Sequence, residues 1–196
     1  TAFEIPDPAC SSATVMVEAD EGDEIGGPGF WCNQLRFARE GRPNAKFTTA
    51  ELEAWLLEIF DQSTVFPELW PLATLADAET LLCRPNLAET MADRVARHLL
   101  ATWFNVVSER LPLDTVLGDL CPGDEEPPLE MDPAMTVAEL IAAVETDLVA
   151  GAEDEVLEIW LEILDFVNNS RLPGEGGCEE EFTRRAHNRR HGRLQP

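Results

Sequence analysis

The residues whose chemistry is most constrained by their spacing are five cysteines, and they lie far apart: Cys10, Cys32, Cys83, Cys121 and Cys178. No C-x-x-C pair occurs, so zinc-ribbon, thioredoxin-like and c-type haem sites are not indicated. Wide spacing in an acidic, tyrosine-free chain favours disulfides and an oxidising compartment over free thiols in the cytosol. We predict two intramolecular disulfides, and the odd count leaves one cysteine free or joined to another chain.

Cys32 and Cys83 are one candidate pair, because each borders a predicted helix packed on the same core. A loop of about 50 residues closed in this way would contribute roughly 4 kcal/mol in the chain-entropy model.

Histidines and carboxylates offer few metal sites. His98 lies beside the apolar stripe of a predicted helix, which favours a structural histidine over a ligand or a base. His187 and His191 have the i, i+4 spacing of a helical metal site, but the surrounding arginines argue against one. The acidic runs 18–24 and 124–132 could bind calcium, yet neither has the spacing of an EF-hand loop. We therefore predict no cofactor, with calcium at these acidic loops as the alternative.

Nucleophiles and phosphate-binding motifs give no pattern typical of catalysis. Ser63, Ser108 and Ser170 are not in a G-x-S-x-G context, and no phosphate-cradling glycine motif occurs. Asn168 begins an N-glycosylation sequon. Three of the five tryptophans lie on predicted core faces, which favours packing over a carbohydrate or haem pocket; the five are Trp31, Trp55, Trp70, Trp103 and Trp160. We predict that the protein is not an enzyme.

The charge is strongly acidic and unevenly distributed. The 196 residues carry 38 Asp and Glu against 14 Lys and Arg, a net charge of -24. Such a surface repels nucleic acid and attracts basic partners. Residues 182–196 reverse the sign, with no acid and five arginines: Arg184, Arg185, Arg189, Arg190 and Arg193. No run of 18 apolar residues occurs, so the sequence predicts no membrane span.

Helical signals dominate from residue 30 onward. Capping boxes at Thr48 and Thr136, each with Glu three residues later, predict helix starts. Further helices are expected after Thr74, over about 87–109 behind Asn86, and over about 153–168. The sequence therefore predicts a mainly α fold of about five helices in one bundle stapled by disulfides.

Three segments follow from this pattern. Residues 1–25 form an acidic N-terminal arm with a short strand-like stretch, in which Val15 and Val17 share one side. Residues 26–171 form the helical domain, and residues 172–196 a linker with the basic C-terminal tail. A lone strand must pair with a distant segment or another molecule, so Val15, Val17 and the five tail arginines are the candidate interaction residues.

The border between arm and helical domain is the stretch GGPGFWCNQ, residues 26–34. Its glycines and proline predict a sharp turn, with Asn33 as a cap for the following turn. Phe30 and Trp31 are expected to anchor that turn by burial. The predicted core is Phe30, Trp31, Trp55, Leu56, Ile59, Val95, Leu99, Trp103, Ile141, Val144, Trp160 and Ile163. Phe60, Val156 and Ile159 are also expected on inward helix faces.

Residues 28–34, Pro-Gly-Phe-Trp-Cys-Asn-Gln, resemble the P-G-[FY]-W-K-N-H motif of a helical domain in secreted bacterial and archaeal proteins. The resemblance extends over roughly residues 26–171, through ARHLLATWFNV (96–106) with Asn105 and LEILDFVNNSR (161–171) with Asn168. The chain departs from the motif at Cys32, where Lys is usual, and at Gln34, where His is usual. The resemblance implies an extracellular protein without an assigned reaction.

Two functions agree with these patterns. The first is a secreted or periplasmic structural or interaction module that contacts protein partners, including other copies of itself as an oligomer or filament. The second is an extracellular ligand-binding protein or hydrolase with a pocket between helices. The charge asymmetry, the strand-like arm and the odd cysteine favour the first.

Overall fold

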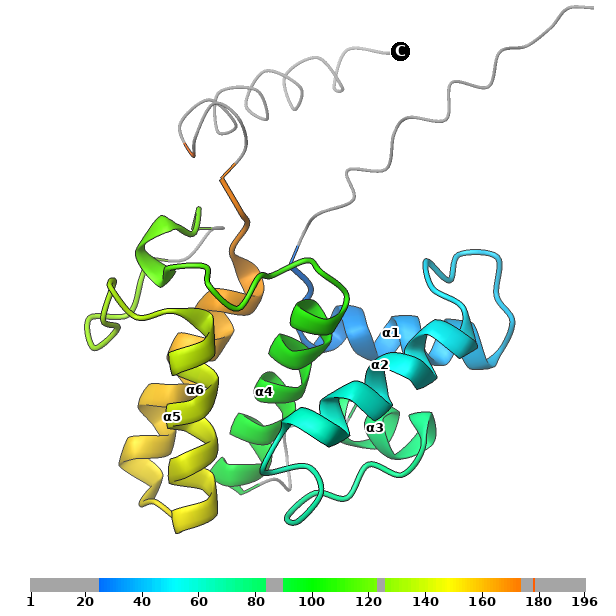
Figure 1. The fold of residues 1–196 in the computed structure, drawn as a ribbon, viewed down its shortest axis with the longest axis horizontal. Helices are drawn as coiled ribbons and strands as arrows, with labels where there is room; N and C mark the ends of the chain where they lie inside the picture. The colour runs from blue at the N-terminus through cyan, green and yellow to red at the C-terminus, as the bar shows by residue number, and fades with distance from the viewer. Residues whose placement is uncertain (1–24, 84–89, 123–125, 174–177, 179–196) are drawn as a thin grey trace, which may run out of the picture.

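The computed structural model describes residues 25–83, 90–122, 126–173 and 178. These residues fold into six α-helices and one 3₁₀ turn, and two isolated β-bridges are the only extended pairing among them (Figure 1). The elements are α1 (Pro28–Arg39), α2 (Thr49–Gln62), α3 (Leu75–Leu82), α4 (Met91–Val107), η1 (Leu117–Asp119), α5 (Val137–Ala150) and α6 (Asp154–Asn169). The predicted mainly α bundle is confirmed, while Val15, Val17 and the five tail arginines lie outside the described residues.

Four helices begin with the same reciprocal cap. In each, a threonine side chain accepts a hydrogen bond from a backbone N–H three residues later, and that residue's carboxylate accepts one from the threonine backbone. The pairs are Thr48–Glu51, Thr74–Asp77, Thr90–Asp93 and Thr136–Glu139. These hydrogen bonds lower the pKa values of Glu51 and Glu139.

The predicted bounds of the longest helix were wrong at both ends. It begins at Met91, because Thr90 is extended and caps the first turn with Asp93. It ends at Val107, and the next residues leave the helix through Glu109, whose φ of 61° is left-handed. The predicted cap Asn86 lies outside the described residues.

The glycine-rich border opens a helix directly rather than forming a sharp turn before one. Pro28 occupies the first turn of α1, where its missing N–H costs nothing. Gly26 is required by close packing, since a Cβ there would lie 2.3 Å from the Phe30 ring. Asn33 lies exposed inside α1, so the predicted capping role for Asn33 was wrong.

Helix α4 is the centre of the bundle. It packs most extensively against α6 on one side and meets α1, α2 and α3 on the other, while α5 and α6 form an antiparallel pair (Figure 1). The predicted core is confirmed for Trp31, Leu56, Ile59, Val95, Leu99, Trp103, Ile141, Val144 and Ile163, which are buried. Phe30, Trp55 and Trp160 are partly buried against it.

Three residues predicted to face inward are exposed, namely Phe60, Val156 and Ile159. In α6 the buried stripe follows Leu157, Leu161 and Leu164, which places Val156 and Ile159 at its edges. Phe60 lies on α2 beyond the face that α4 covers.

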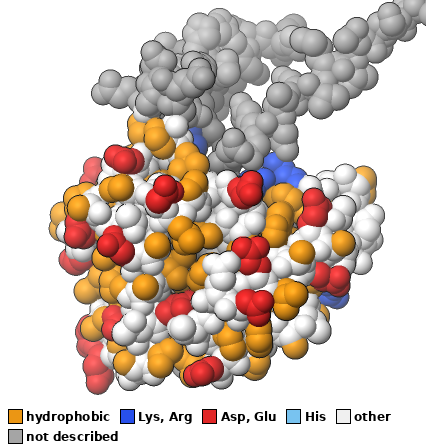
Figure 2. Space-filling view, viewed as in Figure 1, with side chains coloured by type: hydrophobic (Ala, Val, Ile, Leu, Met, Phe, Trp, Pro, Cys, Tyr) orange, Lys and Arg blue, Asp and Glu red, His pale blue; other side chains and the backbone are white. Residues whose placement is uncertain are grey.

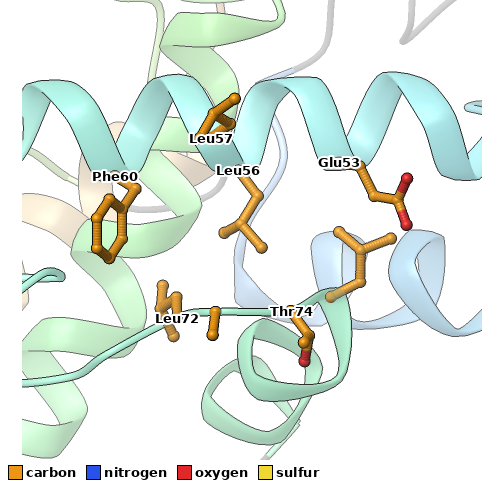
Figure 3. A pocket seen from close by; sticks show the side chains of 8 residues that line it. Glu53, Leu56, Leu57, Phe60, Leu72 and Thr74 are labelled. Atoms are coloured by element: carbon orange, nitrogen blue, oxygen red, sulfur yellow. The ribbon is translucent and has the colours of Figure 1, made fainter.

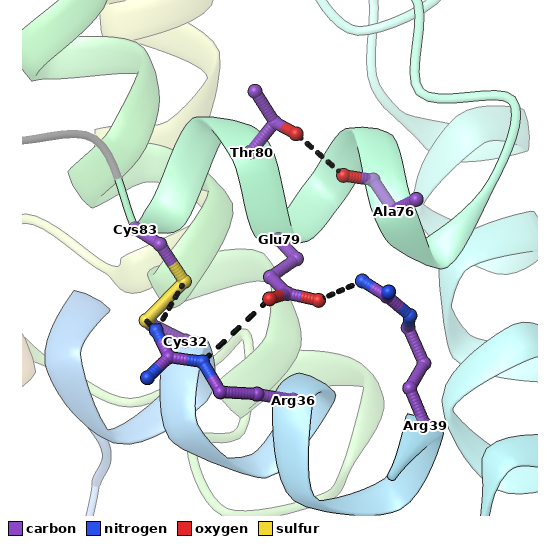
Figure 4. Close-up of a disulfide and its surroundings, with 7 residues drawn as sticks. All are labelled: Cys32, Arg36, Arg39, Ala76, Glu79, Thr80 and Cys83. Carbon is purple, nitrogen blue, oxygen red and sulfur yellow. Dashed lines mark hydrogen bonds and ion pairs between the residues drawn. A yellow bond between two sulfur atoms is a disulfide. The ribbon is translucent and has the colours of Figure 1, made fainter.

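Two disulfides join distant segments, as predicted. Cys32–Cys83 links α1 to the end of α3 across 51 residues, and Cys121–Cys178 closes a separation of 57. The first is flanked by Arg36, whose Nη2 lies 3.4 Å from the sulfur of Cys32, and which also pairs with Glu79 (Figure 4). Cys10 lies outside the described residues. The described helices include none long and apolar enough to cross a bilayer.

Candidate functional site

A buried carboxylate, Glu145 on α5, organises the first polar cluster. Only 5% of Glu145 is exposed. Its Oε1 accepts hydrogen bonds from Ser63 Oγ at 2.6 Å and Trp103 Nε1 at 2.9 Å, and its Oε2 accepts from the backbone and hydroxyl of Thr64 at 2.9 and 2.8 Å. Burying a charge is costly unless donors replace the lost water, and these four donors do so. The cluster therefore fixes the end of α2 against α4 and α5.

Ser63 is positioned for structure rather than nucleophilic attack. Its hydroxyl donates to Glu145 and accepts from the backbone N–H groups of Val65 and Phe66 at 3.1 and 3.3 Å. The side chain is buried, and every polar contact that it makes holds the turn after α2. A serine engaged in this way has no open face for a substrate.

The second polar cluster joins residues that carry the sequence resemblance. Asn105 accepts hydrogen bonds from Gly26 N at 2.8 Å and Trp31 Nε1 at 3.1 Å, and it donates to Gly26 O at 2.9 Å and Asn168 Oδ1 at 3.1 Å. Asn168 also accepts from Thr102 Oγ1. These amides connect α1, α4 and α6 with paired donors and acceptors. Since Asn168 is only 1% exposed, its sequon is closed to glycosylation in the folded chain.

The two positions at which the chain departs from the resembled motif also make structural contacts. Cys32 is in the disulfide with Cys83, and buried Gln34 accepts a hydrogen bond from Lys46 N at 2.8 Å. Trp31 lies between Phe47 and Phe104, stacked against both at ring-centroid distances of 5.4 and 5.1 Å. This end of the bundle is a packed aromatic cluster.

His98 lies on α4 facing α6, and its buried Nδ1 makes no hydrogen bond. Its Nδ1 is 3.3 Å from Asp165 Oδ1 on α6. Burial lowers the pKa of His98 to about 4, and Arg97 and Arg94 act in the same direction, while Asp165 partly offsets them. His98 is therefore neutral at pH 7, with its main-chain carbonyl accepting from Asn168.

The tryptophans lie in the core or pack against it. Four indole N–H groups donate to separate side chains: Trp31 to Asn105, Trp70 to Asp93, Trp103 to Glu145 and Trp160 to Asp147. Buried indoles usually find such a partner. The prediction that packing explains these residues is confirmed for Trp31 and Trp103, which are buried, and the other three are partly buried.

An open apolar groove lies on the outer side of α2. Its volume is about 430 Å³, within the range of ligand-sized sites. Leu56 and Phe60 point from α2 towards the segment that carries Leu72 and Thr74, and Glu53 lies at one end (Figure 3). The full lining is Glu53, Leu56, Leu57, Phe60, Leu72, Ala73, Thr74 and Leu75. Leu57 is 63% exposed and Phe60 37%, so apolar side chains here face water.

The groove lies in an acidic part of the chain. Residues 47–83 contain seven acids and no Lys or Arg, and one of the seven, Glu79, is paired with Arg36 and Arg39 of α1. Carboxylates are spread over the face seen in Figure 2, with few basic side chains at its edges and hydrophobic patches between them. The surface near the groove thus combines exposed apolar area with negative charge.

Neither Glu145 nor the groove was predicted from the sequence. Glu145 could have been found, because it follows Val144 and lies four residues after Ile141, on the apolar stripe of its helix. The groove had no such signal, since Leu57 lies beside a predicted apolar face and its exposure depends on where α3 packs.

The sites expected at the chain ends are not among the described residues; these include Cys10, His187 and His191 and the acidic run 18–24. Within the described part of the chain, no three His, Cys, Asp or Glu side chains gather closely enough to hold a metal ion. Residues 126–132 of the second acidic run are included in that statement. Comparison of the chain with protein-family models, curated proteins and solved structures found no match.

Proposed function

We propose that this protein is an extracytoplasmic, non-enzymatic interaction module that binds a basic protein segment in the groove on α2. The observation that carries the proposal is the exposed apolar lining of that groove, above all Leu57 on a helix whose other apolar positions are mostly buried. Exposed apolar surface gathered in one depression is typical of a binding site.

The location outside the cytoplasm is supported by the two disulfides, which persist in oxidising compartments. The non-enzymatic role is supported by the interior, where Glu145, Ser63, Asn105 and Asn168 are engaged with one another or with neighbouring backbone and indole groups. Side chains used in this way hold helices together and are closed to a substrate.

The chemistry of the partner follows from the charge. Glu53 lines the groove, and Glu58 and Asp61 lie on the same helix, so an acidic partner would be repelled. A partner with an apolar side chain for the groove and arginines or lysines around it would gain both contacts. Such segments combine hydrophobic anchors with charges that steer association.

The test is fluorescence anisotropy with two synthetic amphipathic peptides of equal apolar content, one with arginines and one with glutamates on the polar face. We expect the arginine peptide to bind and the glutamate peptide not to. Leu57→Ser should weaken binding at least tenfold, about 1.4 kcal/mol. Val149→Ser is the matched control, because Val149 is 51% exposed on α5, away from the groove. Equal binding of both peptides, or no effect of Leu57→Ser, would contradict the proposal.

A further inference from the structure

The C-terminal segment of this chain has the chemistry that the groove on α2 requires. Residues 182–196 contain five arginines, no acid and one aromatic side chain, Phe182. Phe182 lies two residues before Arg184, the first of these arginines. We propose that Phe182 of one copy binds in the α2 groove of a second copy, with Arg184 and Arg185 beside the carboxylates of α2. This inference rests on the proposed function of the groove.

The starting point of the segment is fixed by the fold. Cys178 is bonded to Cys121, and Cys121 pairs through its backbone with Arg171, just beyond α6. The chain leaves α6 at the top of Figure 1, whereas α2 and α3 lie on the other side of α4. The tail therefore begins on the α6 side of the bundle, opposite the groove.

The short segment between Cys178 and Phe182 favours binding to the groove of a second copy over the groove of the same chain. Phe182 is four residues beyond Cys178, and four extended residues span at most about 14 Å. A path from α6 across α4 to α2 covers two helix packings of roughly 8–10 Å each, before passing around the outer face of α2. Since this distance exceeds the reach of Phe182, the same chain's groove is out of range. A neighbouring copy has no such restriction.

Charge complementarity supplies the second argument. Glu53 lines the groove, and Glu58 and Asp61 lie on the same helix. After three glutamates at residues 179–181, residues 182–196 carry five arginines and no acid, so the arginines that follow Phe182 complement this helix. Exposed ion pairs contribute at most about 1 kcal/mol each and are screened by salt, so the apolar contact of Phe182 must carry much of the affinity. Association should accordingly be concentration-dependent and weaker at high salt.

The geometry predicts a head-to-tail arrangement. Tail and groove are different surfaces, so each bound copy leaves one free tail and one free groove. Such a contact propagates unless the rotation closes into a ring. The proposed contact would make the chain a subunit of an oligomer or filament.

The experiment measures the particle mass of the full chain by light scattering at increasing protein concentration, in 50 mM and in 0.5 M NaCl. The screening length is roughly threefold shorter at the higher salt concentration. We expect the mass to rise with concentration in low salt and to fall on adding salt. Phe182→Ser and Leu57→Ser should each abolish association, while Val149→Ser should leave the mass unchanged. Circular dichroism of each variant confirms that the helices are intact.

A mixture of the two variants gives the decisive result. The Phe182→Ser chain keeps its groove and the Leu57→Ser chain keeps its tail, so together they should form a complex of two chains and stop there. A monomeric full chain at all concentrations, or a mass unaffected by Phe182→Ser, overturns the inference. If the arginine peptide still binds the groove in that case, the partner is another protein and the proposed function stands. If the peptide does not bind either, both fail.

Discussion

The interior of the bundle and the groove on α2 contrast in which side chains are buried and which face water. Inside, charged and amide groups are buried and meet matching donors and acceptors, as around Glu145 and Asn105. On α2, leucine and phenylalanine are left in water. Buried polar groups that are fully paired hold a fold in one arrangement, whereas exposed apolar groups gain only by binding something. This contrast indicates that the interior stabilises the fold, and it is consistent with the proposed role of the groove in binding.

The largest expected effect is on stability, from Glu145→Ala. Removing the carboxylate leaves Ser63 and Trp103 as buried donors without an acceptor, which should lower the free energy of unfolding by about 4 kcal/mol. Urea denaturation measures the change. Glu158→Ala removes the same charge from an exposed site and should change stability by less than about 0.5 kcal/mol. Equal effects of the two substitutions would show that Glu145 holds nothing together.

Asn105→Ala should have the next largest effect, lowering the free energy of unfolding by about 3 kcal/mol, because Gly26, Trp31 and Asn168 lose their partner. Asn33→Ala, at an exposed position of α1, is the control. The double variant Asn105→Ala/Asn168→Ala should cost clearly less than the sum of the single substitutions, since both break one network. Strict additivity in urea denaturation would contradict a shared network.

His98 should make stability depend on pH. Burial lowers the pKa of His98 to about 4 in the folded chain. On acidification the unfolded chain therefore protonates His98 near pH 6.5, whereas the folded chain protonates it only near pH 4. The free energy of unfolding should therefore fall on acidification, by about 2 kcal/mol between pH 7 and pH 5 from this group. In urea denaturation at both pH values, the His98→Gln variant should lose about 2 kcal/mol less unfolding free energy between pH 7 and pH 5 than the unchanged protein. An identical pH profile for both chains would refute this role.

The smallest expected effect on stability comes from the groove. Leu57→Ser should change the free energy of unfolding by less than about 0.5 kcal/mol, because 63% of Leu57 is already in water. Thermal denaturation checks this on the same preparation used for peptide binding. A loss as large as that of Glu145→Ala would make Leu57 part of the core and remove the contrast between the two regions.

Much of the fold could be predicted from local sequence patterns. Thr48 and Thr136 specify helix starts through contacts only three residues long, and the stripe of α4 identifies Val95, Leu99 and Trp103 as core. The wide cysteine spacing indicated disulfides, and the pair Cys32–Cys83 is confirmed. Each of these inferences uses neighbours along the chain or the side of one helix. The net charge and the basic tail are likewise properties of the sequence itself.

The tertiary structure decided everything that depends on contacts between distant segments. Asn105 and Asn168 are 63 residues apart, and only the packing of α6 on α4 makes them one network. Phe60 and Leu57 are exposed because the covering helices stop short of that side of α2, which no periodicity in α2 reveals. Helix patterns fix which residues share a face, but burial is fixed by what packs against it, and that is settled only when the whole chain has folded.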